Sequence, residues 1–323
     1  MANNRKKPVV VVTEPLDEPS IEYLREHADV RIIEIDELPE HIAQADGLIV
    51  RTYTQVNREL LERAPNLKVV GRAGVALENI DLSECKARGI EVVHTPEANT
   101  LAVVDYTVRM IIELNRRFWP MTHPIPPEEF MALRKQSYGR FISGLTLGII
   151  GLGRIGSRVG RAAVGLGMKV IYNDIRKVEP DYPAESVDKD TLYANSDIVT
   201  LHVPLTNLTR NLINADTLSR FKPGAQLINS ARGACVVAAD LAEAIKAGRI
   251  SGAAIDCHHP EPPPPDYPLF GLENVILTPH IAARVPAALA AMCEVVYDVV
   301  AVLQGRKPKY PADDYIKSMG ESL

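Results

Sequence analysis

Three ionisable side chains of different chemical types follow successive apolar runs in the second half of the chain. Arg232, Glu261 and His280 each come within a few residues of the end of such a run. A guanidinium can bind a carboxylate, and an imidazole can take up or release a proton near neutral pH. If the runs are parallel strands, their carboxyl ends meet where open α/β sheets place ligands. The three side chains therefore predict a site for chemistry on a small bound molecule.

Each of these residues also has a purely structural interpretation. Arg232 could be a solvated or capping residue, Glu261 could belong to a loop surface, and His280 could cap a helix. Taken singly, the structural interpretation is the better one. The coincidence of a cation, a carboxylate and an imidazole at three strand ends favours a functional site.

A glycine-rich loop lies earlier in the same half of the chain. Gly151, Gly153 and Gly156 fit the pattern G-x-G-x-x-G, directly after the apolar run 147–150 and at the start of a helical stretch. Side chains at these positions would block a tight turn, a bound pyrophosphate or helix–strand packing. The N-terminus of the helix supplies N–H donors for phosphates. Asp174 ends the next predicted strand, where a carboxylate accepts hydrogen bonds from an adenosine ribose.

The charges around Asp174 bear on the choice between NAD and NADP. The carboxylate of Asp174 repels a 2′-phosphate and so favours NAD. Arg176 and Lys177 follow closely and could bind such a phosphate. NAD is therefore the predicted cofactor, and NADP is the less favoured alternative.

The cysteines and the paired histidines predict no metal site. Four cysteines are far apart in the chain and form no C-x-x-C pair, so neither zinc binding nor a disulfide framework is indicated. His258 and His259 suggest a metal at first sight, but adjacent residues rarely chelate one ion, and the sequence offers no evident third ligand.

The elements that must position these residues form two series of alternating strands and helices. The first series has short apolar runs at 9–13, 30–33, 47–50, 68–70 and 91–93. After a helical stretch at about 101–117 and a loop rich in Pro and Met, six more runs follow at 147–150, 169–173, 198–203, 226–229, 252–256 and 275–278. This alternation predicts doubly wound α/β sheets, the second of them complete for dinucleotide binding. A last apolar helical stretch at about 285–303 has no evident place in either series.

Length and composition limit the class of protein further. A chain of 323 residues predicts two domains, and 46% hydrophobic with 24% charged residues excludes a largely disordered chain. The net charge of −5 argues against a general electrostatic grip on nucleic acid. No apolar run approaches the roughly 20 residues of a membrane span, and the start of the chain leaves no room for the apolar core of a signal peptide. We therefore expect a cytoplasmic protein without nucleic-acid or membrane partners.

Several longer motifs resemble the D-isomer-specific 2-hydroxyacid dehydrogenase family. They include Asn-Ser-Ala-Arg-Gly at 229–233, Gly-Ala-Ala-Ile-Asp at 252–256 with Pro-Glu-Pro at 260–262, and Thr-Pro-His-Ile-Ala at 278–282. The first half of the chain adds the similar segments 71–75, 79–81 and 95–100. The similarity extends from about residue 46 to residue 282, in the order and spacing of the family.

The resemblance implies a discontinuous architecture. A Rossmann NAD domain at 102–286 would be inserted into a flavodoxin-like substrate domain made of 1–101 and 287–323, with the active site in a cleft. The last helical stretch would then belong to the substrate domain, which would explain its place after the second series of strands.

The resemblance also implies roles for the three ionisable residues. Arg232 would hold the carboxylate and carbonyl oxygen of the substrate, since its donors form a planar fork. His280 would be the general acid in ketone reduction and the base in alcohol oxidation. Glu261 would pair with His280 and favour its protonated form.

Further positions are implied as ligand contacts. A backbone loop at Gly74, Val75 and Ala76 would take the substrate carboxylate. The cofactor contacts implied by the resemblance are Gly151, Gly153, Arg154, Ile155, Gly156, Asp174, Val203, Pro204, Ser230, Ala231, Arg232, Asp256 and His280.

The sequence departs from the family pattern at some positions. His258 and His259 stand where an aromatic-containing stretch is usual after Asp256 and Cys257. Formate-type relatives pair their histidine with glutamine, so Glu261 argues against that activity, and the lysine expected of phosphite-type relatives near 76–77 is absent.

The predicted activity is hydride transfer between NAD(H) and a small D-2-hydroxy or 2-keto acid. The alternative from a different class is an NAD-binding interaction protein that resembles the corepressor members of the family, which keep the same catalytic residue types. The resemblance also implies a homodimer, and the end of the chain at Leu323 suggests no regulatory extension.

Overall fold

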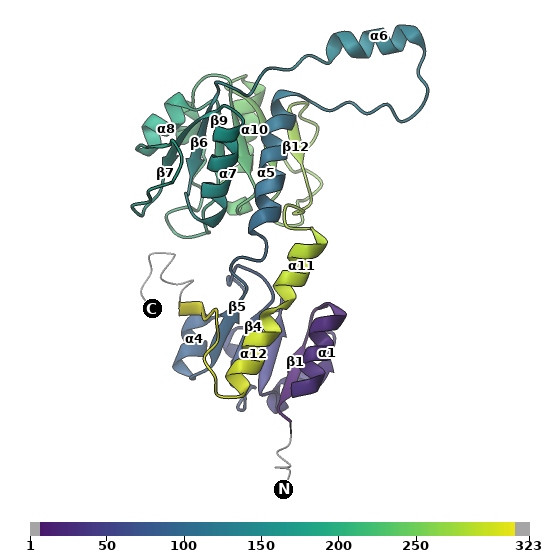
Figure 1. Ribbon diagram of the computed structural model, residues 1–323, viewed down its shortest axis with the longest axis vertical. Helices are drawn as coiled ribbons and strands as arrows, with labels where there is room; N and C mark the ends of the chain where they lie inside the picture. Colours follow the sequence, from purple (N-terminus) through teal and green to yellow (C-terminus); the bar gives the residue numbers. More distant parts are fainter. Residues whose placement is uncertain (1–6, 314–323) are drawn as a thin grey trace. The chain divides into compact units, whose positions relative to one another are not determined.

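The computed structural model describes residues 7–313, which form two compact units. The first unit combines Met1–Asn99 with Arg284–Leu323, and the second is Thr100–Ala283. Residues 1–6, on which the signal-peptide prediction rests, and residues 314–323 at the end of the predicted substrate domain lie outside the described residues. The second unit is thus an insertion between the two segments of the first (Figure 1).

The first unit contains a parallel sheet with strand order β2-β1-β3-β4-β5. Its strands are β1 (Val9–Val12), β2 (Asp29–Ile32), β3 (Gly47–Val50), β4 (Val69–Arg72) and β5 (Glu91–His94). The order is the flavodoxin-like one. The chain starts inside the sheet at β1, adds β2 on one side of it, and then continues with β3, β4 and β5 on the other side. The central strands β1 and β3 are buried at every position, as expected for strands covered by helices on both faces.

The helices of the first unit come from both ends of the sequence. They are α1 (Glu18–His27), the short α2 (Leu38–His41), α3 (Arg58–Glu62), α4 (Leu82–Ala87), α11 (Pro286–Cys293) and α12 (Val295–Leu303). Asp17, Asn57 and Asp81 cap α1, α3 and α4 by accepting backbone N–H groups of the first turn. A side chain on Gly71 of β4 would collide with Val299 of α12, so glycine permits the close approach of helix and strand.

The apolar stretch predicted at 285–303 forms two helices instead of one. The two helices meet at Glu294, which is the C-cap of α11 and the N-cap of α12. Among the described residues, Pro286–Leu303 is the one stretch long and apolar enough to span a membrane by composition, with a mean hydropathy of 1.8, and half of it is buried. Val295, Val296, Val299 and Val300 belong to the core of the first unit, so α12 is a core helix of that unit.

The second unit contains a seven-stranded parallel sheet with order β12-β11-β10-β9-β6-β7-β8. Its strands are β6 (Thr146–Ile150), β7 (Lys169–Asn173), β8 (Glu185–Ser186), β9 (Ile198–Leu201), β10 (Ala225–Asn229), β11 (Ile250–Ile255) and β12 (Val275–Leu277). This is the Rossmann order with one additional strand beyond the usual six. The prediction of six strands missed β8, because two exposed residues carry no apolar pattern.

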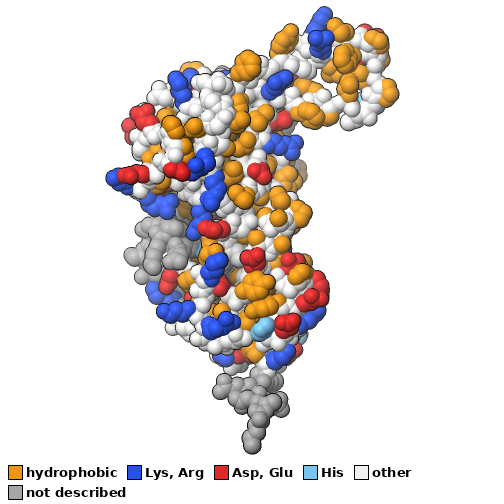
Figure 2. Space-filling model, viewed as in Figure 1, with side chains coloured by type: hydrophobic (Ala, Val, Ile, Leu, Met, Phe, Trp, Pro, Cys, Tyr) orange, Lys and Arg blue, Asp and Glu red, His pale blue; other side chains and the backbone are white. Residues whose placement is uncertain are grey.

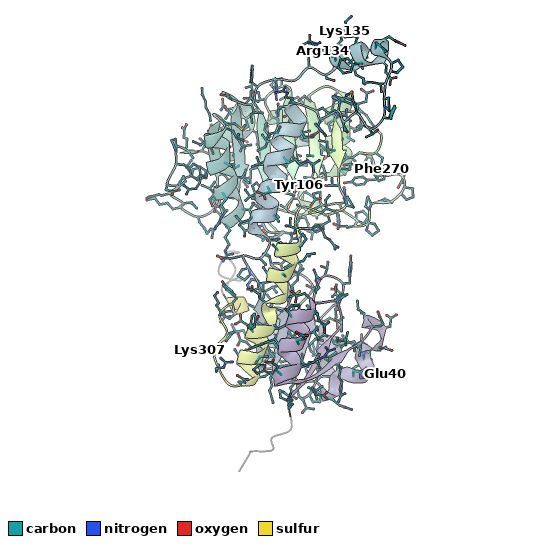
Figure 3. The ribbon with its side chains drawn as sticks, turned by 45° about the vertical axis from the view of Figure 1, so that its right-hand side comes forward. Glu40, Tyr106, Arg134, Lys135, Phe270 and Lys307 are labelled. Carbon is teal, nitrogen blue, oxygen red and sulfur yellow. The ribbon has the colours of Figure 1, made fainter. Side chains whose placement is uncertain are left out.

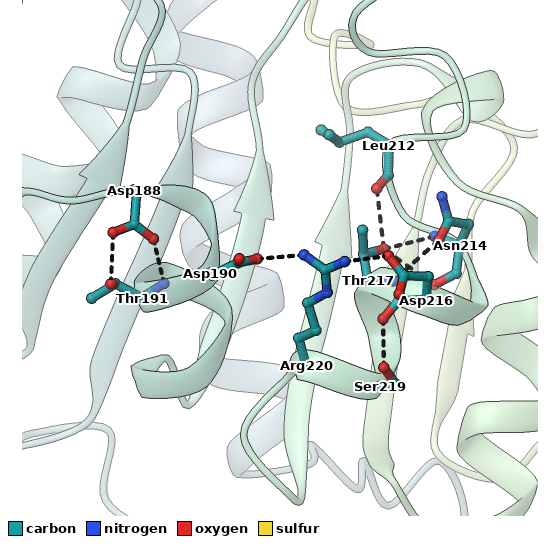
Figure 4. A network of polar contacts seen from close by, with 9 residues as sticks. All are labelled: Asp188, Asp190, Thr191, Leu212, Asn214, Asp216, Thr217, Ser219 and Arg220. Atoms are coloured by element: carbon teal, nitrogen blue, oxygen red, sulfur yellow. Dashed lines mark hydrogen bonds and ion pairs between the residues drawn. The ribbon is translucent and has the colours of Figure 1, made fainter.

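The helices of the second unit are α5 (Thr100–Asn115), α6 (Pro127–Gln136), α7 (Arg154–Gly165), α8 (Lys189–Asn195), α9 (Ala215–Arg220) and α10 (Ala238–Lys246). Helices α5 and α7 pack side by side against the sheet (Figure 1). A network of polar contacts at the starts of α8 and α9 is shown in Figure 4: Asp188 caps α8, Asn214 caps α9, and Arg220 bridges Asp190 and Asp216.

A long exposed segment separates α5 from β6. We call residues 116–142 the arm; it includes α6, where the sequence predicts only a loop. Nearly every position from 116 to 141 is exposed, and Figure 2 shows hydrophobic side chains over this segment. The sequence missed α6 because its start, Pro-Pro-Glu-Glu, lies in a Pro-rich stretch typical of loops.

Candidate active site

The glycine loop joins β6 to α7, and at each of its three glycine positions a different feature of the structure favours a residue without a side chain. Gly151 has a φ of +92°, and a Cβ there would lie 2.5 Å from the carbonyl oxygen of His202. A Cβ on Gly156 would collide with the carbonyl of Gly151. A Cβ on Gly153 would meet only the end of the Arg176 side chain, at 3.6 Å, so this position leaves room for a ligand.

The loop is suited to hold the pyrophosphate of a dinucleotide. Gly153 is the N-cap of α7 and makes no side-chain capping bond to the first turn. The first-turn N–H groups and the positive end of a 12-residue helix therefore suit a phosphate. The residues present fit a dinucleotide cofactor.

Asp174 follows β7 and is tied to the glycine loop. Its side chain is 6% exposed; Oδ2 accepts the N–H of Leu152 at 2.7 Å and Oδ1 the N–H of Arg176 at 2.9 Å. The Arg176 side chain, half exposed, lies 3.4 Å from Oδ1 through Nε. The carboxylate thus fixes the loop as well as standing at the predicted ribose position, a second role that the sequence did not reveal.

The strand ends beyond the glycine loop bring the other predicted cofactor positions to the same edge of the sheet. Val203 and Pro204 follow β9, and Ser230 and Ala231 follow β10. Ser230 Oγ lies 3.4 Å from the hydroxyl of Thr107 on α5.

His202, between β9 and Val203, was not among the predicted residues. Its N–H donates to Ile150 at 2.8 Å, and its ring lies 3.1 Å from the Thr200 hydroxyl. Burial lowers the pKa of His202 to about 3, so its imidazole is neutral at physiological pH. Its backbone forms the wall against which Gly151 packs.

The turn that carries Arg232 is organised by a buried amide. Asn229, at the end of β10 and fully buried, donates from Nδ2 to the Arg232 carbonyl at 2.9 Å and accepts the Ala231 N–H at 3.1 Å. The Arg232 guanidinium is partly exposed and donates from Nη1 to the Ala231 carbonyl at 2.7 Å. The side chain is therefore held at the ligand edge of the sheet.

The turn that carries His280 is fixed by Asp256, which follows β11 and is fully buried. Its Oδ1 accepts the Thr278 hydroxyl at 2.6 Å and the Ile281 N–H at 2.8 Å, and its Oδ2 accepts the Ala282 N–H at 2.9 Å. His280 itself has a φ of +53°, and its N–H donates to the Asp256 carbonyl at 2.9 Å. An unfavourable backbone conformation persists only where its surroundings over-determine it, which these bonds do.

Glu261 and His280 form a direct pair. His280 Nδ1 lies 2.7 Å from Glu261 Oε1, and both side chains are about two-fifths exposed (43% and 41%). A carboxylate accepts only, so Nδ1 carries the proton of this bond and Nε2 is the nitrogen left for exchange with a ligand. The arrangement can orient an imidazole and stabilise its charged form.

The loops after β10 and β11 touch one another. A side chain on Gly233 would collide with the backbone of His258, and the Cys257 thiol donates to the Ala231 carbonyl at 3.5 Å. Burial raises the pKa of this thiol. The nearby charge of Arg232 lowers the same pKa, and the charge of Glu261 raises it. The structure thus brings the predicted cation, carboxylate and imidazole to the ends of three neighbouring strands, β10, β11 and β12.

The predicted carboxylate loop, Gly74 to Ala76, lies in the first unit after β4. Gly74 has a φ of +150°, and the Val75 carbonyl lies 2.8 Å from Nδ1 of the buried His94. The next loop along the sheet, 51–54 after β3, is held by Glu14, whose carboxylate accepts the N–H groups of all four of its residues. Contact of the Gly74–Ala76 loop with a ligand stays a prediction.

Between residues 7 and 313, no group of three or more His, Cys, Asp or Glu side chains could hold a metal ion. His258, which the sequence singled out with His259, is buried and bonds within the protein instead. Its Nε2 lies 2.9 Å from the Thr278 carbonyl and its Nδ1 3.5 Å from the Tyr267 hydroxyl.

One further residue near the site, Tyr106, escaped the sequence analysis. Tyr106 of α5 lies 2.6 Å from the Thr278 hydroxyl, which in turn donates to Asp256 (Figure 3 labels Tyr106). Tyr106 and Thr278 are 172 residues apart, and no spacing rule connects them. Thr278 itself opens the motif 278–282 that contains His280.

The residues 108–282 match the family model described as "D-isomer specific 2-hydroxyacid dehydrogenase, NAD binding domain". The chain is 37% identical to a glyoxylate reductase of Thermofilum pendens over 94% of this chain and 93% of that one. It is 36% identical to a hydroxypyruvate reductase of Thermotoga maritima over 86% of this chain and 92% of that one.

A third relative is longer. A D-3-phosphoglycerate dehydrogenase of Archaeoglobus fulgidus is 37% identical over 85% of this chain, and the match spans about half (53%) of its length.

Solved structures agree in fold along nearly the whole chain. The TT0316 protein of Thermus thermophilus superposes with a TM-score of 0.83 at 34% identity, covering 94% of this chain and 99% of that one. A D-lactate dehydrogenase of Aquifex aeolicus, solved with NAD and lactic acid, gives 0.77 at 29% identity over 97% and 100%.

The fold and the site therefore define an NAD-dependent oxidoreductase with two α/β units and a Rossmann cofactor domain. This chain belongs to the D-isomer-specific 2-hydroxyacid dehydrogenase family. Its cofactor is NAD, and the glycine loop at the start of α7 fits a dinucleotide.

Proposed function

We propose that this protein reduces a small 2-keto acid to the D-2-hydroxy acid with NADH, and catalyses the reverse oxidation with NAD. The observation that carries the proposal is the 2.7 Å contact between His280 Nδ1 and Glu261 Oε1, beside the Arg232 turn at the ligand edge of the sheet. Membership of a family of 2-hydroxyacid dehydrogenases supports the same reaction class.

In the reductive direction, His280 supplies the proton. Bound NADH supplies the hydride, which adds to the carbonyl carbon of the substrate. As the hydride arrives, the carbonyl oxygen takes the proton from His280 Nε2 and becomes the hydroxyl of the product. Glu261 holds the ring through Nδ1 and stabilises the imidazolium form that can donate.

Arg232 holds the substrate carboxylate and carbonyl oxygen in this proposal. A planar guanidinium can contact two oxygens at once and polarises the carbonyl toward hydride addition. The bonds from Asn229 to the backbone on either side fix the turn from which this side chain extends.

The names of the relatives guide the choice of substrates for a test. Wild type should be assayed with NADH and NADPH on glyoxylate, hydroxypyruvate, pyruvate, 2-oxoglutarate, phenylpyruvate and phosphohydroxypyruvate. We expect turnover of at least one of these. The variant His280→Ala should lose about 10²–10⁴-fold in kcat while keeping its NADH affinity, since general acid catalysis contributes that much.

The outcome separates catalysis from mere cofactor binding. A wild-type protein that binds NADH but turns over none of the acids would contradict the proposal. Undiminished turnover by His280→Ala would remove the acid role while leaving the oxidoreductase class intact.

Asp174 supports a preference for NADH. Its carboxylate would repel a 2′-phosphate near the ribose. Because it also holds Leu152, Asp174→Ala should weaken NADH binding by loosening the loop as well as relax the preference. A wild type that uses NADPH better than NADH would show the assignment of Asp174 to be wrong.

We also propose that the protein is a homodimer. In a single copy of the chain the arm exposes aromatic side chains, among them Phe118, Tyr138 and Phe141. A second copy packed on the arm would cover them.

A further inference from the structure

His258 is a buried histidine that the proposed mechanism does not use. It follows β11, two residues after Asp256 and three before Glu261, and only 6% of the residue is exposed. The resemblance to the family leads one to expect an aromatic-containing stretch here, and this chain has an imidazole. Its contacts decide what that imidazole does.

The partners of His258 fix which ring nitrogen carries its proton. Nε2 lies 2.9 Å from the carbonyl oxygen of Thr278, which can only accept, so Nε2 is the donor. In the neutral ring Nδ1 is then an acceptor, and the Tyr267 hydroxyl 3.5 Å away can donate to it. Burial raises the pKa of Tyr267 to about 12, so this hydroxyl keeps its proton. The Tyr267 ring also meets the His258 ring edge to face, with centroids 5.4 Å apart.

The hydroxyl and the carbonyl group of Thr278 have different hydrogen-bond partners. Its hydroxyl donates to Asp256 at 2.6 Å, so the Tyr106 hydroxyl, also 2.6 Å away, is the donor of that second contact. Thr278 is thus held through its hydroxyl by Asp256 and Tyr106, and through its carbonyl by the ring of His258. It lies two residues before His280.

His258 also lies against the segment of Glu261. Its backbone N–H donates toward Glu261 Oε2, at a long 3.5 Å, while Oε1 of the same carboxylate is the partner of His280. The contacts form a closed cycle that runs from His258 to Thr278, along the chain to His280, across to Glu261 and back to His258.

We propose that His258 is a positioning residue that sets the geometry of the Glu261–His280 pair. Its ring donor anchors the turn that carries His280, and its backbone donor orients the carboxylate that meets His280. This inference rests on the proposed function for its catalytic consequence, but the position of His280 can be measured without turnover.

The test replaces the ring donor and keeps the ring. In His258→Phe an aromatic ring still packs against Tyr267, but the Thr278 carbonyl loses its side-chain donor. Misplacement of a reacting group by about 1 Å can cost 10²-fold, so we expect kcat for the best keto acid to fall about ten- to hundredfold. KM and the NADH dissociation constant should change by less than about threefold.

A rescue variant and two controls separate positioning from simple destabilisation. His258→Gln restores an N–H donor at a similar distance from the backbone and should recover most of kcat. Tyr267→Phe removes only the distant hydroxyl and should cost much less than His258→Phe. His259→Phe makes the same replacement at the adjacent exposed residue and should retain wild-type kcat.

A second readout does not depend on turnover. Nitrogen-15 spectra of histidine-labelled full-length protein report which ring nitrogen of His280 carries the proton. In wild type the contact with Glu261 fixes the proton on Nδ1, and we expect this state to be mixed in His258→Phe and restored in His258→Gln.

The results discriminate in both directions. An unchanged kcat together with an unchanged His280 spectrum in His258→Phe would overturn the proposal. So would a loss of kcat in His258→Phe that tracks the melting temperature and is not recovered by His258→Gln. A wild type without turnover would defeat the proposed function alone, and the spectra would still decide the role of His258.

Discussion

Arg232 extends from a turn that leaves its planar group at the ligand edge of the sheet. We predict that Arg232→Lys lowers kcat/KM for the best keto acid about ten- to more than a hundredfold. A lysine keeps the charge but cannot contact two oxygens in one plane, and a charge-assisted hydrogen bond contributes about 1.5–3 kcal/mol. Steady-state kinetics of wild type and variant measure kcat/KM, and NADH titrations serve as the control for cofactor binding. Near-normal kinetics in Arg232→Lys would remove this residue from substrate binding.

Glu261 should hold the His280 ring in the orientation that leaves Nε2 for the keto acid. Its carboxylate lies 2.7 Å from His280 Nδ1 and can only accept, which fixes the proton of the bond on that nitrogen. In Glu261→Gln the side-chain amide can also donate to Nδ1, so the ring orientation is no longer fixed, and we expect reductive kcat to fall about ten- to a hundredfold. Steady-state kinetics of both proteins, with the NADH dissociation constant as control, test this; an unchanged kcat would contradict the pairing.

At the residue scale, the sequence could predict which types of side chain meet at the site, but not the hydrogen bonds that position them. Arg232, Glu261 and His280 each stand near a strand end, so a parallel sheet was enough to bring them to one edge. Tyr106, His258 and Thr278 meet only through tertiary packing, which local pattern does not encode. Asp174 was predicted for the ribose, and its bond to Leu152 depends on the turn geometry of the glycine loop.

At the scale of elements, the apolar runs predicted the longer strands. Each run that the sequence predicted as a strand overlaps a strand of the structure, because strands buried on both faces need apolar or β-branched residues. The elements that escaped prediction lack this signal. Strand β8 has two exposed residues, α6 has a Pro-rich start, and the helix break at Glu294 divides a stretch that is apolar on both sides.

Glu14 shows how one side chain stabilises an element of the first unit. It lies just after β1 and is 6% exposed; its oxygens accept from the backbone of loop 51–54 and from the Thr54 hydroxyl. Burial by itself raises the pKa of Glu14, but the loop N–H groups outweigh it and hold the pKa below its usual value of 4.5. The charged form is therefore bound more strongly in the folded state than in the unfolded one.

We predict that Glu14→Gln destabilises the first unit by about 1–3 kcal/mol at neutral pH, because an amide offers one good acceptor to several N–H groups. Since the folded pKa is depressed, the carboxylate contributes fully above about pH 4.5, and its contribution is lost as the pH falls through the folded value. The difference between wild type and variant should therefore shrink in acid. Hydrogen exchange of the loop 51–54 amides, measured from about pH 7 to about pH 4, follows this directly; a difference that stays constant or grows would refute it.

At the scale of the whole molecule, a flavodoxin-like unit and a Rossmann unit divide the chain at 99–100 and 283–284. The substrate contacts predicted at Gly74 to Ala76 belong to the first unit, and the acid–base pair belongs to the second. On these predictions, cofactor binding and part of the substrate binding belong to different units. Family membership follows from the second unit alone, whose residues 108–282 match the NAD-binding model.

The arm bears on the assembly of the molecule. Tyr138 and Phe141 are each 88% exposed, although most of the aromatic side chains elsewhere in the second unit are buried in its core. The groove beside α5, where the arm begins, is lined by Val104, Val108 and Ile112 together with charged residues. Gathered exposed apolar side chains of this kind mark interfaces in soluble proteins, and a two-fold homodimer is the commonest assembly.

We therefore predict a dimer of about twice the chain mass of 35.5 kDa, held together through the arm. The double variant Tyr138→Ser with Phe141→Ser removes two large apolar side chains from that interface and should shift the protein toward monomer at micromolar concentration. Ile32→Ser is the matched control, because Ile32 is 55% exposed on the first unit and far from the arm in sequence. Light scattering after size exclusion gives the masses, and NADH binding confirms that each variant is folded. A wild type that is monomeric at high concentration, or a double variant as dimeric as the control, would show that the arm serves another purpose.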